Sequence, residues 1–145
     1  MEIRRATVDD VRAVAWLACL LWPHHTLLEM EEEMEGFLND SDSAIFLAVE
    51  DGAAVGFAQA ALRHDYVEGA DHSPCGYLEG IYVIEAYRSR GFATQLLNAC
   101  ENWAREQNCF QFASDCEISN NASLIFHLKC GFCETNRIVC FIKEL

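Results

Sequence analysis

The sequence is poor in several features, and each shortage excludes a class of protein. Two prolines and eight glycines are spread over 145 residues, and no linker rich in proline, glycine or serine interrupts the chain. No apolar run approaches the roughly 20 residues that a membrane-spanning helix needs, and the first residues lack the apolar stretch of a secretory signal. We therefore expect one domain, residues 1–145, in the cytoplasm.

Basic residues are also scarce. The chain holds 10 Lys and Arg against 23 Asp and Glu, so its formal net charge is −13. Such a charge repels nucleic acids and anionic membranes, and we expect neither as a partner. It favours a cationic partner, although a surface charged only for solubility would have the same composition.

The eight cysteines are expected to be reduced in a cytosolic protein. Cys130 and Cys133 form one C-x-x-C, and with His72 and Cys75 they would make up a four-ligand zinc site. No second C-x-x-C supports that interpretation, and Cys130 closes a predicted helix. We therefore expect no metal.

Apolar spacing and turn signals divide the chain into strands and helices. Thr7 is a candidate helix N-cap, Asp51-Gly52 is typical of a hairpin turn, and Gly131 is a natural helix C-cap. We expect strands at about residues 2–5, 45–50, 53–62, 77–83, 110–114 and within 133–143, and helices at about 7–22, 27–39, 91–108 and 121–129. This order is typical of a mixed α/β (α+β) domain with a parallel crossover through the third of these helices.

The segment that joins the strand at 77–83 to the next helix contains Arg88-x-x-Gly91-x-Ala93. Its small residues let the backbone approach a ligand closely. The free N–H groups of the first helical turn then point at one spot, which is how a helix N-terminus binds phosphate oxygens. Arg88 and Arg90 add positive charge nearby.

This turn resembles the pyrophosphate loop of the GCN5-related N-acetyltransferase (GNAT) superfamily, which reads Arg/Gln-x-x-Gly-x-Gly/Ala. Asn120-Asn121 and Lys129-Cys130-Gly131-Phe132 extend the resemblance, which covers essentially the whole chain. It implies acetyl-coenzyme A (acetyl-CoA) as co-substrate and a mixed sheet of about six to seven strands, splayed between the fourth and fifth strands and flanked by about four helices. The cofactor-binding residues that it implies are Ile81, Tyr82, Val83, Ser89, Arg90, Gly91, Phe92, Ala93, Thr94 and Asn120.

Four short sequence motifs are similar to those of the aminoglycoside 6′-N-acetyltransferases within this superfamily. They are Leu21-Trp22-Pro23, Arg63-His64-Asp65-Tyr66-Val67, Leu78-Glu79-Gly80-Ile81 and Ala113-Ser114-Asp115. The resemblance implies an aminoglycoside as the small-molecule substrate. The substrate-binding positions that it implies are Trp22, His25, Tyr66, Glu79, Asp115 and Asn136. At position 136, where this chain has Asn, related sequences place a Glu.

The residue types fit a polycationic sugar independently of the resemblance. Trp22 and Tyr66 offer flat faces for sugar stacking or cation–π contact. Asp65, Glu79 and Asp115, together with Glu31-Glu32-Glu33, supply negative charge.

Glu79 stands in an otherwise apolar strand, where a carboxylate must be paired, hydrated or functional. As the candidate catalytic base it would take the proton of the acceptor amine, directly or through water. The alternative is a structural ion pair. Asp115, at the carboxyl end of its strand, is either an electrostatic contact for a substrate amine or the N-cap of the following turn. His127 stands where many superfamily members carry a Tyr that protonates the leaving thiolate, yet a lone helical His is more often packed.

Three alternatives on function and assembly remain from the sequence. The acceptor could be another amine, such as a polyamine or a protein N-terminus, or the chain could be a non-catalytic acetyl-CoA sensor. Residues 138–142 form a long apolar strand for a chain end, which predicts a homodimer that covers this edge. The alternative is an internal strand that is already paired on both sides.

Overall fold

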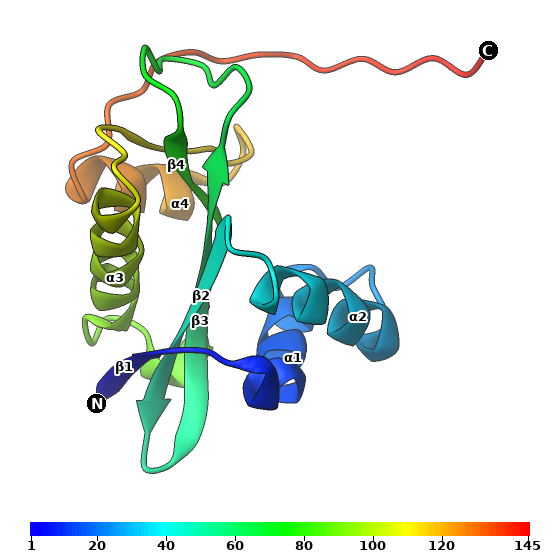
Figure 1. The fold of residues 1–145 in the computed structure, drawn as a ribbon, viewed down its shortest axis with the longest axis vertical. Coiled ribbons are helices and arrows are strands. Elements are labelled where there is room, and N and C mark those ends of the chain that lie inside the picture. Colours follow the sequence, from blue (N-terminus) through cyan, green and yellow to red (C-terminus); the bar gives the residue numbers. More distant parts are fainter.

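A computed structural model describes all 145 residues as a mixed sheet with helices on both faces (Figure 1). The strands are β1 (Glu2–Arg5), β2 (Ser43–Glu50), β3 (Ala53–Arg63), β4 (Cys75–Val83) and β5 (Phe112–Ser114). The helices are α1 (Val11–Leu21), α2 (Leu27–Leu38), α3 (Phe92–Glu106) and α4 (Asn121–Lys129), with short 3-10 helices η1 (Val8–Asp10) and η2 (Glu85–Tyr87). None of these helices has the length and apolar character needed to cross a bilayer.

The strands are ordered β1-β2-β3-β4-β5, with the first four antiparallel and β5 parallel to β4. Helix α3 makes the parallel crossover from β4 to β5, as the sequence predicts. Only Gly76–Leu78 of β4 pairs with β5. The second half of β4, Glu79–Val83, therefore has β3 on one side and no strand on the other.

The core is divided between the two faces of the sheet. On one face α3 packs Phe92, Leu96 and Trp103 against the strands, and on the other α1 and α2 pack Leu17 and Met30. Figure 1 shows this arrangement, with α3 on one side of the strands and the α1–α2 pair on the other. Both faces of the central strands are thus buried, so a ligand can reach the sheet only at the edges and ends of its strands.

Local signals account for several boundaries. Asp51 and Gly52 both have positive φ, 51° and 78°, as a tight hairpin turn requires. The hydroxyl of Thr26 accepts the Glu29 N–H at 3.2 Å and begins α2. Before α1, Arg4 holds both carboxylate oxygens of Asp10 at 2.8 Å, which lowers the pKa of that carboxyl to about 2.

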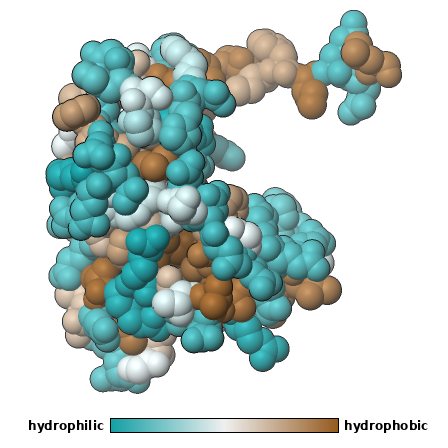
Figure 2. All heavy atoms as spheres, viewed as in Figure 1, coloured by the Kyte–Doolittle hydropathy of each residue, from teal (hydrophilic) through white to brown (hydrophobic).

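The C-terminal strands expected within residues 133–143 do not form. The sheet has five strands instead of six to seven, and the chain beyond α4 runs extended, away from the body (Figure 1). A strand needs a neighbour for its backbone N–H and C=O groups, and this chain offers the segment none. Figure 2 shows its apolar side chains standing clear of the body, with Phe141 and Ile142 92% and 97% exposed.

Candidate active site

The turn before α3 lines a cavity of about 400 Å³. Gly91, the N-cap of α3, has φ 86°, and no atom lies within 4 Å of a Cβ built on it. The first N–H groups of α3 lack intrahelical partners, so they are free to meet a ligand in this cavity. Its walls are Val83, Tyr87, Arg88, Ser89, Gly91, Phe92, Ala93, Thr94, Ala122, Ile125, Phe126 and Lys129.

Six of the predicted cofactor residues line this cavity, namely Val83, Ser89, Gly91, Phe92, Ala93 and Thr94. The other four lie outside its walls. Ile81 and Tyr82 belong to the part of β4 that pairs with β3 but not with β5, Arg90 pairs with Glu50 at 2.6 Å, and Asn120 caps α4 by accepting the Ser123 N–H at 3.1 Å. The role of α4 as one wall of the cavity was not predicted from the sequence. The four residues of α4 that line it, Ala122, Ile125, Phe126 and Lys129, have helical spacing.

Arg88 has a structural task beside the cavity. Its Nε donates to the carbonyl of Val83 at 2.8 Å, and its guanidinium lies 5.2 Å from the ring of Tyr82. These contacts fix the end of β4 against the turn that follows. The phosphate-binding capacity of the turn consequently rests more on backbone N–H groups than on the two arginines.

Glu79 is paired with Arg63 of β3. Arg63 Nε donates to Oε1 and Nη2 to Oε2, both at 2.9 Å. The Glu79 side chain is 25% exposed and that of Arg63 41%. The structural ion pair considered from the sequence therefore exists. Each carboxylate oxygen nevertheless keeps a further acceptor position for a substrate donor.

Asp115 joins the same group of side chains through Tyr77 of β4. The Tyr77 hydroxyl donates to Asp115 Oδ2, and the Arg63 guanidinium lies 3.5 Å from the centroid of the Tyr77 ring. Burial, reinforced by this hydrogen bond, raises the pKa of the Tyr77 phenol above its ordinary value. Glu79 and Asp115 are thus connected through Arg63 and Tyr77, two residues that sequence reasoning did not assign to the site.

Trp22 reaches the site from the end of α1. A Cβ added to Gly80 would lie 2.6 Å from Trp22 Cη2 and 2.7 Å from Cζ2. Only a glycine admits the indole this close to β4, immediately beside Glu79. The ring also meets Phe57 edge-on at 6.1 Å. Trp22 therefore combines core packing with a place next to a predicted substrate contact.

Tyr66 and Asn136 come together in a second group, through Glu68. The Tyr66 hydroxyl donates to Glu68 Oε2, and Asn136 Nδ2 donates to Oε1 at 2.8 Å. Tyr66 is 81% exposed. Glu68 is a residue that sequence reasoning missed, because an isolated loop Glu has no local signal.

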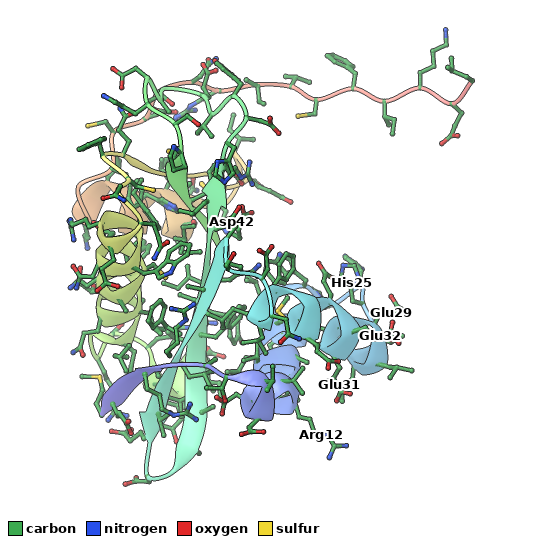
Figure 3. All side chains as sticks on the ribbon, viewed as in Figure 1. Arg12, His25, Glu29, Glu31, Glu32 and Asp42 are labelled. Atoms are coloured by element: carbon green, nitrogen blue, oxygen red, sulfur yellow. The ribbon has the colours of Figure 1, made fainter.

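His25, before α2, has no hydrogen bond or ion pair with either group, and its ring lies 3.9 Å from Glu29. Figure 3 shows His25, Glu29 and Glu32 on the α2 side of the molecule and Asp42 beside the sheet, where it meets His64 at 2.9 Å. The outline of the molecule is indented between the α1–α2 pair and the extended tail (Figure 2). The acids of α2 give this side of the molecule a negative field.

His127 is packed. Its Nδ1 lies 2.7 Å from the Ser123 carbonyl oxygen, which only accepts, so Nδ1 carries a proton. Its Nε2 lies 2.7 Å from the Ser114 hydroxyl. The ring also contacts Phe132, with centroids 5.0 Å apart. These contacts favour the packed interpretation of His127 over an acid role.

Metal-ligating side chains are not gathered anywhere in the chain. No group of three or more His, Cys, Asp or Glu has the geometry to hold an ion. All eight cysteines are free.

Comparisons with known proteins agree with this geometry. Residues 9–132 match the Acetyltransferase (GNAT) family. An aminoglycoside N(6′)-acetyltransferase type 1 of Salmonella typhimurium (strain LT2) is 42% identical over 144 residues, 99% of both chains. One of Stenotrophomonas maltophilia is also 42% identical, over 99% of this chain and 93% of its own.

Solved structures extend the comparison to three dimensions. AAC(6′)-Iy, in complex with the bisubstrate analog CoA-S-monomethyl-acetylneamine, has a TM-score of 0.95 and 38% identity, over 99% of this chain and 98% of that one. The apo 6′-N-acetyltransferase AAC(6′)-IG of Acinetobacter haemolyticus has a TM-score of 0.93 and 35% identity, over 100% and 99%. The chain therefore belongs to the GNAT acetyltransferase family and, within it, to the aminoglycoside 6′-N-acetyltransferases.

Proposed function

We propose that this protein transfers the acetyl group of acetyl-CoA to the 6′-amino group of aminoglycosides. The observation that carries the proposal is the linked group Glu79, Arg63, Tyr77 and Asp115, which lies beside Trp22 where β4 loses its neighbouring strand. This group places two carboxylates, Glu79 and Asp115, where β4 and β5 stop pairing. The relatives named above support this function, since they carry that activity in their names.

The chain is suited to hold the co-substrate in two places. The residues of the first turn of α3 line the cavity, and their free N–H groups would bind the pyrophosphate. The backbone of Ile81–Val83, unpaired on its β5 side, would bind the pantetheine arm in the manner of a neighbouring strand. Acetyl-CoA supplies an acetyl group that is already activated as a thioester.

The acceptor side would bind an ammonium and then remove its proton. Glu79 and Asp115 offer acceptor oxygens for the substrate amine, and Trp22 offers a flat face for a sugar ring. A protonated amine has no lone pair, so Glu79 takes its proton directly or through water. The neutral amine attacks the thioester carbonyl, which the backbone N–H near Ile81 polarises. The C–S bond then breaks and CoA leaves as a thiolate, which a thiol pKa of about 8.5 makes a fair leaving group, while the nitrogen loses its remaining extra proton to solvent.

Two other functions keep the fold and the co-substrate. One is acetylation of a different amine, such as a polyamine or a protein N-terminus, and the other is a non-catalytic sensor. We would incubate the protein with acetyl-CoA and a panel of kanamycin-type aminoglycosides, polyamines and peptides, measure thiol release and locate the acetyl group by mass spectrometry. We expect turnover on the aminoglycosides, at the 6′ amine. Turnover confined to polyamines or peptides, or none at all, would contradict the proposal.

Tyr77→Phe tests the link between the two carboxylates. The phenyl ring keeps the contact with Arg63, but Asp115 loses the hydroxyl that holds it. Because a hydrogen bond to a charged group contributes about 1.5 kcal/mol or more, the aminoglycoside KM should rise about tenfold. The acetyl-CoA KM serves as internal control and should not change. An unchanged aminoglycoside KM would mean that Asp115 is held without Tyr77, or that it does not bind substrate.

We further propose that the protein is a homodimer in which residues 138–142 of the extended C-terminal tail (residues 133–145) pair with a second copy. Support comes from Ile138, Val139, Phe141 and Ile142, which are all at least 73% exposed in the isolated chain. An unpaired apolar strand of this kind favours pairing with another chain. Light scattering should give twice the 16.4 kDa of the chain. Deletion of residues 138–145 should give a monomer, and a 16.4 kDa particle for the full chain would refute the dimer.

The predictions of one domain over residues 1–145 and of a cytoplasmic location also stay as proposals. The two packed faces of a single sheet support the first. The eight free cysteines support the second, because thiols persist in reducing compartments.

A further inference from the structure

The loop between β3 and β4 is attached to the start of the C-terminal tail by one side chain, Glu68. Tyr66 donates to one of its oxygens and Asn136 to the other, from positions 2 residues before it and 68 residues after it in the chain. Next to it Gly69 packs so tightly that an added Cβ would lie 2.6 Å from Thr135 Cγ2. Figure 1 shows the loop and the start of the tail side by side. The contact therefore fixes Glu68 between two segments.

Glu68 is the charged member of this group. Both neighbours donate to it, and their hydrogen bonds, that of Tyr66 first, hold the pKa of the carboxyl below its ordinary value. A carboxylate has about four acceptor positions, of which two are used here. Glu68 is thus ionised, oriented and able to accept further donors from solvent or from a ligand.

Asn136 has its amide committed within the protein. Its Nδ2 donates to Glu68, and its Oδ1 accepts the Arg137 N–H at 2.8 Å. The amide carries no net charge, so its attraction for an ammonium is weak compared with that of the adjacent carboxylate. A cation stacked on the exposed Tyr66 ring would meet Glu68, to which the hydroxyl of that ring is bonded.

We propose that Glu68, and not Asn136, binds a substrate ammonium at this place, and that Asn136 is a positioning residue that holds the carboxylate. The inference rests on the proposed function, since it concerns the same polycationic substrate. It adds a binding carboxylate that the sequence motifs do not include. The competing explanation is a purely structural attachment of the loop to the tail.

The first test is Glu68→Gln, which keeps the shape and an acceptor oxygen but removes the charge. We expect the aminoglycoside KM to rise about fivefold, as for loss of one exposed ion pair, with kcat and the acetyl-CoA KM unchanged. The matched control is Glu134→Gln, which removes one charge from the start of the tail beside this loop, where Glu134 pairs with Arg137. The control should leave the aminoglycoside KM unchanged.

The second test moves the charge across the hydrogen bond. Glu68→Asn alone should raise the aminoglycoside KM, and adding Asn136→Glu should return it to within about twofold of the parent value, because the carboxylate reappears at the other end of a 2.8 Å contact. If the pair only attached the loop to the tail, any well-packed polar pair would serve, and the aminoglycoside KM would not follow the position of the carboxylate.

Several outcomes would overturn the inference. A parent-like KM in Glu68→Gln, an equal effect of Glu134→Gln, or no rescue in the double variant would each do so. A lower thermal stability with an unchanged KM would assign Glu68 to structure alone. A parent enzyme that acetylates no aminoglycoside would overturn the proposed function and this inference together. A parent enzyme that is active, with variants that behave as just described, would overturn this inference alone.

Discussion

Glu79→Gln should lower kcat for aminoglycoside acetylation by about 10²-fold or more, the usual contribution of a general base. The amide keeps the shape of the side chain but takes up no proton. The acetyl-CoA KM should barely change, because the variant leaves the cavity at α3 intact.

The ion pair with Arg63 makes a control necessary, because Glu79→Gln also leaves Arg63 without its partner. Arg63→Met breaks the same pair while the carboxylate remains. If Glu79 acts on the amine, Arg63→Met should retain much more of kcat than Glu79→Gln. If the pair is only structural, both variants should lose similar stability and similar activity. Near-normal kcat in Glu79→Gln would end the general-base proposal and leave Glu79 as a binding carboxylate.

Gly91→Val should raise the acetyl-CoA KM by about tenfold or more, the equivalent of about 1.4 kcal/mol of binding. A Cβ at this position meets no protein atom within 4 Å, and Gly91 is one of the residues that line the cavity. The two methyl groups of Val would then occupy the space through which phosphate oxygens reach the N–H groups of α3.

Gly52→Val is the matched control for this prediction. Gly52 also has positive φ, 78° against 86°, and also has no atom within 4 Å of a built Cβ, but it lies in the β2–β3 hairpin. Both variants should lose about 1–3 kcal/mol of stability through the same backbone strain. Only Gly91→Val should change the acetyl-CoA KM. A folded Gly91→Val enzyme with the parent acetyl-CoA KM would refute the assignment of the pyrophosphate site to this turn.

The local features of the fold follow from the sequence alone, because each depends on neighbours in the chain. Asp51-Gly52 adopts the two positive φ angles of its turn, and Gly91 and Gly131 mark the start of α3 and the end of α4 with positive φ. Apolar spacing gave the helices to within a few residues. The turn before α3 was recognisable because its small residues and helix start are contiguous.

The tertiary structure decided which side chains meet. The bonds Arg63–Glu79 and Tyr77–Asp115 join residues 16 and 38 positions apart, and Asn136–Glu68 spans 68. Residue type predicts that a carboxylate in a strand needs a partner but does not identify that partner. The tail shows the same limit from the other direction. Its β propensity is local and visible in the sequence, whereas a strand exists only where another backbone lies alongside, and the folded chain provides none.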